Sequence, residues 1–119
     1  MKIAVSADKQ SDDATVDPRF GRAACFAIVE TDTGETTFID NAQNLQAAQG
    51  AGIQAAQTVA ESGAQWVLTG HCGPKAFRAL SAAGIKVATD VSGPVAAAVE
   101  QFKAGAFDAS TGADVEGHW

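Results

Sequence analysis

The residues of this chain best suited to chemistry are one His-Cys pair and a small group of cations. His71 and Cys72 carry an imidazole and a thiol, which bind soft metals, and Gly73-Pro74 predicts that a helix begins directly after them. A helix N-terminus attracts anions and lowers the pKa of a nearby thiol. The chain has eight Lys and Arg, of which four lie in or beside two short segments: Arg19, Arg22, Lys75 and Arg78. In a chain of net charge -6, this grouping predicts a local anion site.

A cysteine enzyme is the main alternative use of the same segment. Cys72, five residues and then Arg78 match the spacing of cysteine phosphatases and resemble rhodanese loops, in which a thiolate attacks phosphorus or sulfur while backbone N–H groups and Arg hold the oxyanion. Pro74 removes one of those N–H groups, and Lys75 and Ala79 replace the usual glycine and hydroxyl residues. We therefore expect no catalytic turnover, with a phosphatase or sulfurtransferase as the alternative.

A metal site made by protein side chains alone is not expected. His71 and Cys72 are candidate metal ligands, but no second cluster of Cys and His completes a tetrahedral site. The simpler alternatives are that Cys72 fills space in the core and that His71 is an exposed loop residue. Cys25 falls in a predicted strand and is assigned to packing. A nucleotide-phosphate module is a third hypothesis, weakened because the chain has no Gly-x-Gly-x-x-Gly run.

The hydrophobic pattern predicts the elements that must position these residues. It predicts strands over 3–7, 25–30, 35–40, 66–69 and 85–88, and helices that end at Gly63, span 74–83 and span 94–104. The Thr31–Gly34 turn makes the second and third strands antiparallel neighbours. Strand-helix alternation after residue 65 predicts parallel pairing. The expected fold is α/β, a mixed five-stranded sheet with one antiparallel strand and helices on both faces.

The order of the strands places the candidate residues at one edge of this sheet. With all strands parallel except the second, the connections 8–24, 41–50, 70–73 and 90–93 leave the sheet at the same edge. Ligands of open α/β sheets bind at this edge, where the winding direction switches, here between the first and fourth strands. We therefore expect the Arg19–Arg22 loop to lie beside His71 and Cys72.

Length and composition exclude several classes of protein. A chain of 119 residues with 46% hydrophobic residues predicts a single domain over 1–106, followed by a loose Gly/Asp-rich tail over 107–119, in which His118 and Trp119 could dock. Its net charge of -6 argues against nucleic-acid and anionic-membrane partners. No apolar run approaches the about 20 residues of a membrane span. Two cysteines are too few for a disulfide framework, so the expected location is the reducing cytoplasm.

Several segments, in collinear order over about the first 105 residues, resemble the dinitrogenase iron-molybdenum cofactor biosynthesis family. These segments are Met1–Val5, Arg19–Ala23, Gly50–Ala56, Leu68–Gly70, Gly73–Phe77 and Ala83–Val87. The resemblance implies a ribonuclease-H-like fold and a role in carrying or inserting metal-sulfur clusters. It implies no nuclease activity, because no set of strand-borne carboxylates accompanies Asp8.

Within the family, the Thr69–Pro74 stretch and the acidic tail are most similar to members that hold a Mo-S-Cu cluster non-covalently, with copper bridging two thiomolybdate units. The resemblance therefore implies that the chain binds, carries or assembles such a cluster, with donor or acceptor proteins as further partners. A soft, bulky trianion favours diffuse positive charge, helix N-termini and an apolar wall. The candidate binding residues are Arg19, Phe20, Gly21, Arg22, Gly70, His71, Cys72, Gly73, Lys75, Arg78, Ser92 and Gly93.

Overall fold

The computed structural model describes residues 1–42 and 50–110, and in that part of the chain it has five strands and three helices. The strands are β1 (Lys2–Ala7), β2 (Cys25–Glu30), β3 (Thr36–Asp40), β4 (Trp66–Leu68) and β5 (Lys86–Ala88). The helices are α1 (Ala51–Glu61), α2 (Pro74–Ala82) and α3 (Val95–Lys103). These elements confirm the sequence prediction, and most of the predicted boundaries lie within a residue of the observed ones.

The five strands form one sheet in the order β3-β2-β1-β4-β5. β2 is antiparallel to both β1 and β3, whereas β4 is parallel to β1 and to β5. The predicted mixed sheet with one antiparallel strand is therefore confirmed. The chain changes its winding direction between the neighbours β1 and β4, as expected from the sequence.

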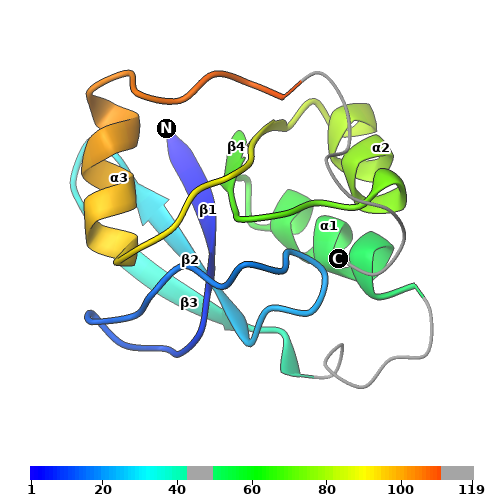
Figure 1. Cartoon of the computed structure of the whole chain (residues 1–119), viewed down its shortest axis with the longest axis horizontal. Helices are drawn as coiled ribbons and strands as arrows, with labels where there is room; N and C mark the ends of the chain where they lie inside the picture. The colour runs from blue at the N-terminus through cyan, green and yellow to red at the C-terminus, as the bar shows by residue number, and fades with distance from the viewer. Residues whose placement is uncertain (43–49, 111–119) are drawn as a thin grey trace.

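Helices cover both faces of the sheet (Figure 1), because successive strand residues point to opposite faces. One core cluster joins Ala4, Ile28, Val67 and Val87 of the sheet to Ala55 and Val59 of α1 and Leu80 of α2. The other joins Ile3, Val5, Val29 and Leu68 to Val95, Ala98 and Val99 of α3. In Figure 1, α1 and α2 lie side by side, and α3 lies at the other side of the molecule.

Gly73-Pro74 and Gly93-Pro94 both precede a predicted helix in the sequence, but the two junctions differ in structure. Pro74 occupies the first turn of α2, as predicted. Pro94 instead precedes α3 in an extended conformation, and Gly93 before it has a φ of +86°. The first N–H of α3, on Val95, donates to the carbonyl of Ala14 at 2.9 Å. The β1–β2 loop therefore covers the start of α3.

The beginning of the predicted loose tail is held against the sheet. Ser110 N–H donates to the carbonyl of Val87 in β5 at 2.7 Å, and the hydroxyls of Ser110 and Thr89 lie 3.1 Å apart. Phe107 packs against the α3-side core. Residues 107–110 thus extend the packed part of the chain beyond the expected limit at 106, because Phe107 finds apolar contacts. The remaining tail residues, His118 and Trp119 among them, lie outside the described residues. Across 1–42 and 50–110, every helix is too short or too polar to cross a membrane.

Candidate anion site at the carboxyl edge of the sheet

The β1–β2 loop is joined to the segment after β4 by backbone hydrogen bonds. His71 N–H donates to the carbonyl of Pro18 at 2.7 Å, and Phe20 N–H donates to the carbonyl of His71 at 3.1 Å. Arg19 and His71 consequently form a parallel bridge. A Cβ atom on Gly70 would lie 2.7 Å from Cα of Pro18, so only glycine permits this approach. The expected adjacency of the Arg19–Arg22 loop to His71 and Cys72 is therefore present.

A buried polar network beneath the loop fixes its position. The Ser6 hydroxyl donates to the carbonyl of Asp17 at 2.7 Å and lies 2.8 Å from the hydroxyl of Thr69. The Asp17 carboxylate is largely buried and accepts a hydrogen bond from Arg19 N–H at 3.0 Å. Its Oδ1 also lies 3.8 Å from Nε of Arg19. Asp17 thus orients Arg19, whose side chain remains 44% exposed and able to reach a ligand.

Asn41 at the end of β3 holds the other end of the loop. Its side-chain amide is fully buried and donates to the carbonyls of Gly21 at 3.2 Å and Ala23 at 2.9 Å. The sequence analysis did not select Asn41. Its place directly after a predicted strand was the one signal in the sequence, and the burial that makes its amide seek backbone partners is visible only in the structure.

The N-termini of α1 and α2 lie together near this loop. A Cβ atom on Gly52, in the first turn of α1, would lie 3.0 Å from Cβ of Ala76, in the first turn of α2. Neither first turn contains an acidic residue. The first N–H groups of a helix have no partner within it and carry partial positive charge. The starts of the two helices therefore place partial positive charge close together.

The helix packed beside α2 is α1 and not α3, whereas the sequence analysis counted Ser92 and Gly93, just before α3, among the binding residues. Ser92 and Gly93 belong to the stretch that enters α3, where Val16 N–H donates to the carbonyl of Gly93 at 2.9 Å. Figure 1 shows α3 on the opposite side of the molecule from α2. Ser92 and Gly93 thus lie apart from the cations of α2. The Gly50-Ala51-Gly52 segment was the signal for the second helix, since close packing of two helices requires small residues.

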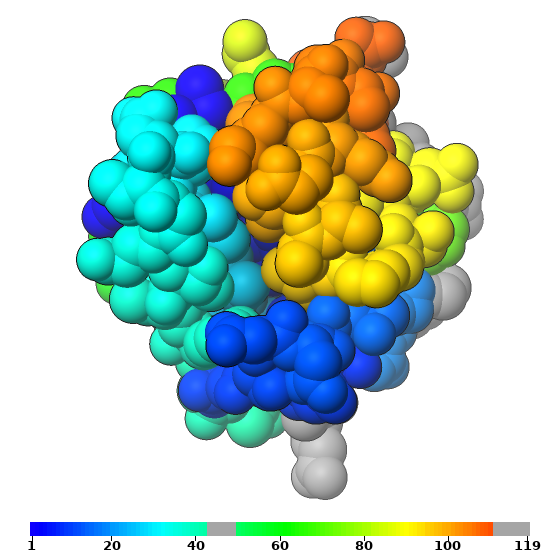
Figure 2. Space-filling view, turned by 90° about the vertical axis from the view of Figure 1, so that its left-hand side faces the viewer, coloured from blue at the N-terminus to red at the C-terminus, as the bar shows by residue number. Residues whose placement is uncertain are grey.

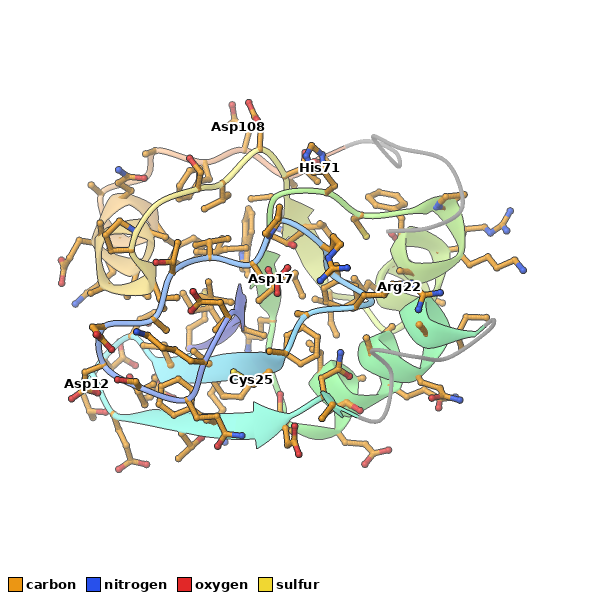
Figure 3. The ribbon with its side chains drawn as sticks, turned by 60° about the horizontal axis from the view of Figure 1, so that its bottom comes forward. Asp12, Asp17, Arg22, Cys25, His71 and Asp108 are labelled. Carbon is orange, nitrogen blue, oxygen red and sulfur yellow. The ribbon has the colours of Figure 1, made fainter. Side chains whose placement is uncertain are left out.

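The predicted cations keep their charges accessible. Arg19, Lys75 and Arg78 are exposed, and Arg22 is half-buried. Figure 3 shows Arg22 on the side of the molecule where α1 and α2 lie, with Asp12 on the opposite side. Lys75 lies in the first turn of α2 and Arg78 in its second, while Arg22 lies on the same side of the molecule as these helices.

Phe20 does not form the apolar wall that the sequence analysis expected. Its side chain is completely buried, with its ring centroid 5.2 Å from that of Phe26. A residue in this position contacts the core and not a ligand. Phe20 therefore anchors the loop. Gly21 and Gly70 are also buried, and they can contribute only backbone groups to the candidate site.

His71 and Cys72 differ in their access to a ligand. His71 is half-buried, whereas the Cys72 side chain is completely buried and its Sγ lies 3.7 Å from the carbonyl of Gly73. Within residues 1–42 and 50–110, no three His, Cys, Asp or Glu side chains form a group that could hold a metal ion.

Cys25 takes no part in this site. Burial of the Cys25 thiol, together with the nearby carboxylates of Asp8, Asp40 and Asp17, raises its pKa to about 11. Its Sγ lies 3.6 Å from the carbonyl of Ala7 within the core. The assignment of Cys25 to packing is confirmed.

Comparison with known proteins identifies a family and a similar solved structure. The sequence model described as dinitrogenase iron-molybdenum cofactor matches residues 1–105. The structure resembles the apo form of the orange protein from Desulfovibrio gigas, with 46% identity over 96% of both chains and a TM-score of 0.93. This likeness confirms the one indicated by the Thr69–Pro74 stretch.

More distant structures share the fold. A Thermotoga protein described as NifB is 28% identical over 98% of both chains, with a TM-score of 0.83. A dinitrogenase-related protein from Methanocaldococcus jannaschii is 14% identical over 94% of this chain and 96% of its own, with a TM-score of 0.68. A search of curated protein sequences gives no match.

Proposed function

This chain belongs to the dinitrogenase iron-molybdenum cofactor family, and from that premise we propose that it binds, carries or assembles a molybdenum-copper sulfide cluster at the carboxyl edge of its sheet. The cluster is its cargo, and the chain has no catalytic turnover of its own. Proteins that donate or accept the cluster are its partners. Two free cysteines suit a reducing compartment, the cytoplasm.

The observation that carries this proposal is the pairing of two helix N-termini among exposed cations. A bis-thiomolybdate-copper unit is a bulky trianion whose metals already have sulfide ligands. It needs positive charge and N–H donors from the protein more than it needs further ligands. The N-termini of α1 and α2, with Arg19, Lys75 and Arg78, offer this combination.

The loop side chains have separate roles in this proposal. Arg19, oriented by Asp17, and Arg22 neutralise the thiomolybdate sulfides from the β1–β2 loop. His71 borders the site and is the protein group best placed to donate a hydrogen bond to a sulfide or to approach copper. Cys72 lies behind it in the core and supports the start of α2.

The cysteine-enzyme alternative fits the geometry less well. An attacking thiolate must reach its substrate, and the Cys72 side chain has no exposed surface. Arg78, its proposed oxyanion partner, lies on the exposed side of α2. Replacing Cys72 by Ser should abolish any phosphatase activity if this alternative holds, and should leave the charge-based uptake of a cluster largely intact.

The direct test is reconstitution with tetrathiomolybdate and copper, followed by gel filtration and metal analysis. We expect a visible absorption band that co-elutes with the protein and a Mo:Cu ratio of about two to one. Lys75→Ala should lower the retained molybdenum several-fold, because it removes a cation from the start of α2. Lys103→Ala is the matched control, since it makes the same change on α3.

Two results would contradict the proposal. One is a colourless protein that retains neither metal. The other is equal loss of metal in Lys75→Ala and Lys103→Ala, which would assign uptake to overall charge and not to this site.

A further inference from the structure

The outer edge of β3 is open for pairing with another strand. β3 is the terminal strand of the sheet, and its five residues pair with β2 in an unbroken antiparallel register. The hydrogen bond from Glu30 N–H to the carbonyl of Glu35, and the one from Asn41 N–H to the carbonyl of Ala24, fix which residues face β2. By the alternation of antiparallel ladders, Thr36, Phe38 and Asp40 direct their N–H and C=O groups outward.

Within residues 1–42 and 50–110, several of the usual protections of a sheet edge are missing from β3. Natural edge strands are blunted by Lys, Pro, a bulge or a covering segment. The β3 sequence Thr-Thr-Phe-Ile-Asp contains neither Lys nor Pro, and its register has no bulge. The opposite edge of the sheet does have a cover, since Ser110 N–H donates to the carbonyl of Val87.

Both faces of the β2–β3 hairpin are hollowed next to this edge. On the α3 side, a cavity of about 280 Å³ has a mixed lining, with the apolar side chains of Val29, Phe38 and Val99 and the charged side chains of Asp12, Glu100 and Lys103. Figure 2 shows this hollow between the hairpin and α3. On the other face, a cavity of about 240 Å³ is lined by residues that include Ile28 and Ile39. Alternate side chains of an added strand would enter the two hollows and cover the half-exposed Phe38 and Ile39.

The charge of the hairpin indicates which kind of strand fits. Residues 25–40 contain four carboxylates and no Lys or Arg. The N-terminal ammonium group of Met1 forms ion pairs with two of them, Glu30 at 2.6 Å and Asp32 at 3.2 Å, and its single charge offsets one of the two. Of the other two, Glu35 precedes β3 and Asp40 is its last residue; neither forms an ion pair within the described part of the chain, and the Asp40 carboxylate accepts a hydrogen bond from Ala42 N–H at 2.9 Å. An approaching basic segment would be attracted, while a second copy of this hairpin would be repelled.

From these features we propose that the free edge of β3 docks an extended basic segment of a partner protein, which pairs with β3 as a sixth strand. Main-chain hydrogen bonds give such docking its affinity, and the two hollows and the flanking carboxylates give it specificity. One of the two hollows is bordered by Ser62 at the end of α1, but neither is lined by residues from the starts of α1 and α2, where the anion site is proposed. The docking can therefore be tested in protein without any cluster. A negative result for docking would leave the proposed function untouched, and the reverse also holds.

The probe for this test is a blocked octapeptide of alternating Val and Lys, titrated into ¹⁵N-labelled protein. We expect chemical-shift changes concentrated at residues 25–40, slower amide exchange at Thr36, Phe38 and Asp40, and weaker binding at high salt. The matched octapeptide of alternating Val and Glu should not bind. Shift changes spread over other surfaces, no change at millimolar peptide, or equal binding of both peptides would overturn the proposal.

Variants of the chain separate charge from strand pairing. Glu35→Lys should lower the affinity for the Val-Lys peptide about fivefold or more, because it replaces an attraction with a repulsion. Asp108→Lys, the same change outside the hairpin, should alter the affinity less than about twofold. Thr36→Pro removes one outward N–H without removing a bond to β2, and should also weaken binding.

Two variant results would overturn the proposal. Equal weakening by Glu35→Lys and Asp108→Lys would show attraction by net charge alone. Concentration-dependent shifts at β3 without peptide would assign the edge to a second copy of this chain. If Thr36→Pro fails to fold, the comparison of Glu35→Lys with Asp108→Lys still tests the proposal.

Discussion

The individual side chains at the carboxyl edge divide into buried groups that hold the backbone and exposed groups that meet a ligand. Phe20 and Asn41 are completely buried and fix the β1–β2 loop. Asp17 is largely buried and orients Arg19, which is exposed. A substitution in the buried group should therefore change stability, whereas one in the exposed group should change binding.

Phe20→Ala tests the buried group. Loss of a completely buried aromatic side chain should lower the free energy of unfolding by about 3–5 kcal/mol. Phe20→Leu, which keeps most of the volume, should cost less than about half as much. Chemical denaturation measures both. Unchanged stability combined with lost cluster uptake would instead make Phe20 a ligand contact.

Cys25 provides a residue-scale test that depends on pH. Its thiol has a pKa raised from 9.0 to about 11 in the folded chain, so folding favours the neutral form. As the pH rises past 9, the unfolded chain loses this proton first, and stability should fall until the folded thiol also ionises near pH 11. Melting temperatures between pH 8 and 11 should therefore fall more steeply in the wild type than in Cys25→Ala. Parallel slopes would contradict the raised pKa.

At the scale of elements, three connections at the carboxyl edge are joined into one platform. Pro18 of the β1–β2 loop accepts a hydrogen bond from His71 after β4. Gly70 in turn accepts one from Asp90 N–H after β5 at 2.7 Å. Asp90 has a φ of +63°, a conformation that non-glycine residues adopt at a cost. The platform holds Arg19 beside the start of α2.

Gly70→Ala tests this platform. The added methyl group would meet backbone atoms of Pro18 at 2.7 and 2.8 Å, so the loop must move. We expect a loss of about 1–3 kcal/mol in stability, together with reduced cluster uptake. Gly52→Ala is the comparison, because its methyl group would meet only the methyl of Ala76 at 3.0 Å and alanine favours the helix. An effect of Gly70→Ala no larger than that of Gly52→Ala would contradict the account.

The predictability of these elements follows from what local patterns encode. Apolar runs and the Gly and Pro residues at element boundaries predicted the strands, the helices and the change of winding direction between β1 and β4. The contact between α1 and α2 was not predicted, because it depends on the packing of Gly52 against Ala76 across distant parts of the chain. For the same reason Gly93 was placed at the site, although the identical Gly-Pro pattern enters a helix on the other face. Phe20 and Asn41 were misjudged or missed since burial is not visible from residue type.

At the scale of the whole molecule, charge is distributed unevenly. Five of the eight Lys and Arg lie in the β1–β2 loop and α2: Lys9, which pairs with Asp13, and Arg19, Arg22, Lys75 and Arg78. The hairpin 25–40 has four carboxylates and no cation. This separation is what both proposals depend on, the inorganic anion at the cations and the basic partner at the acidic hairpin.

Mapping the cluster by NMR tests the central claim most directly. Protein labelled with ¹⁵N is titrated with the preformed molybdenum-copper sulfide anion, and the amide shifts are compared with those of the free protein. The account predicts that the largest changes fall at residues 19–22, 50–52 and 70–76, around the starts of α1 and α2. Largest changes at residues 92–97 on α3, or along the β2–β3 hairpin, would contradict it.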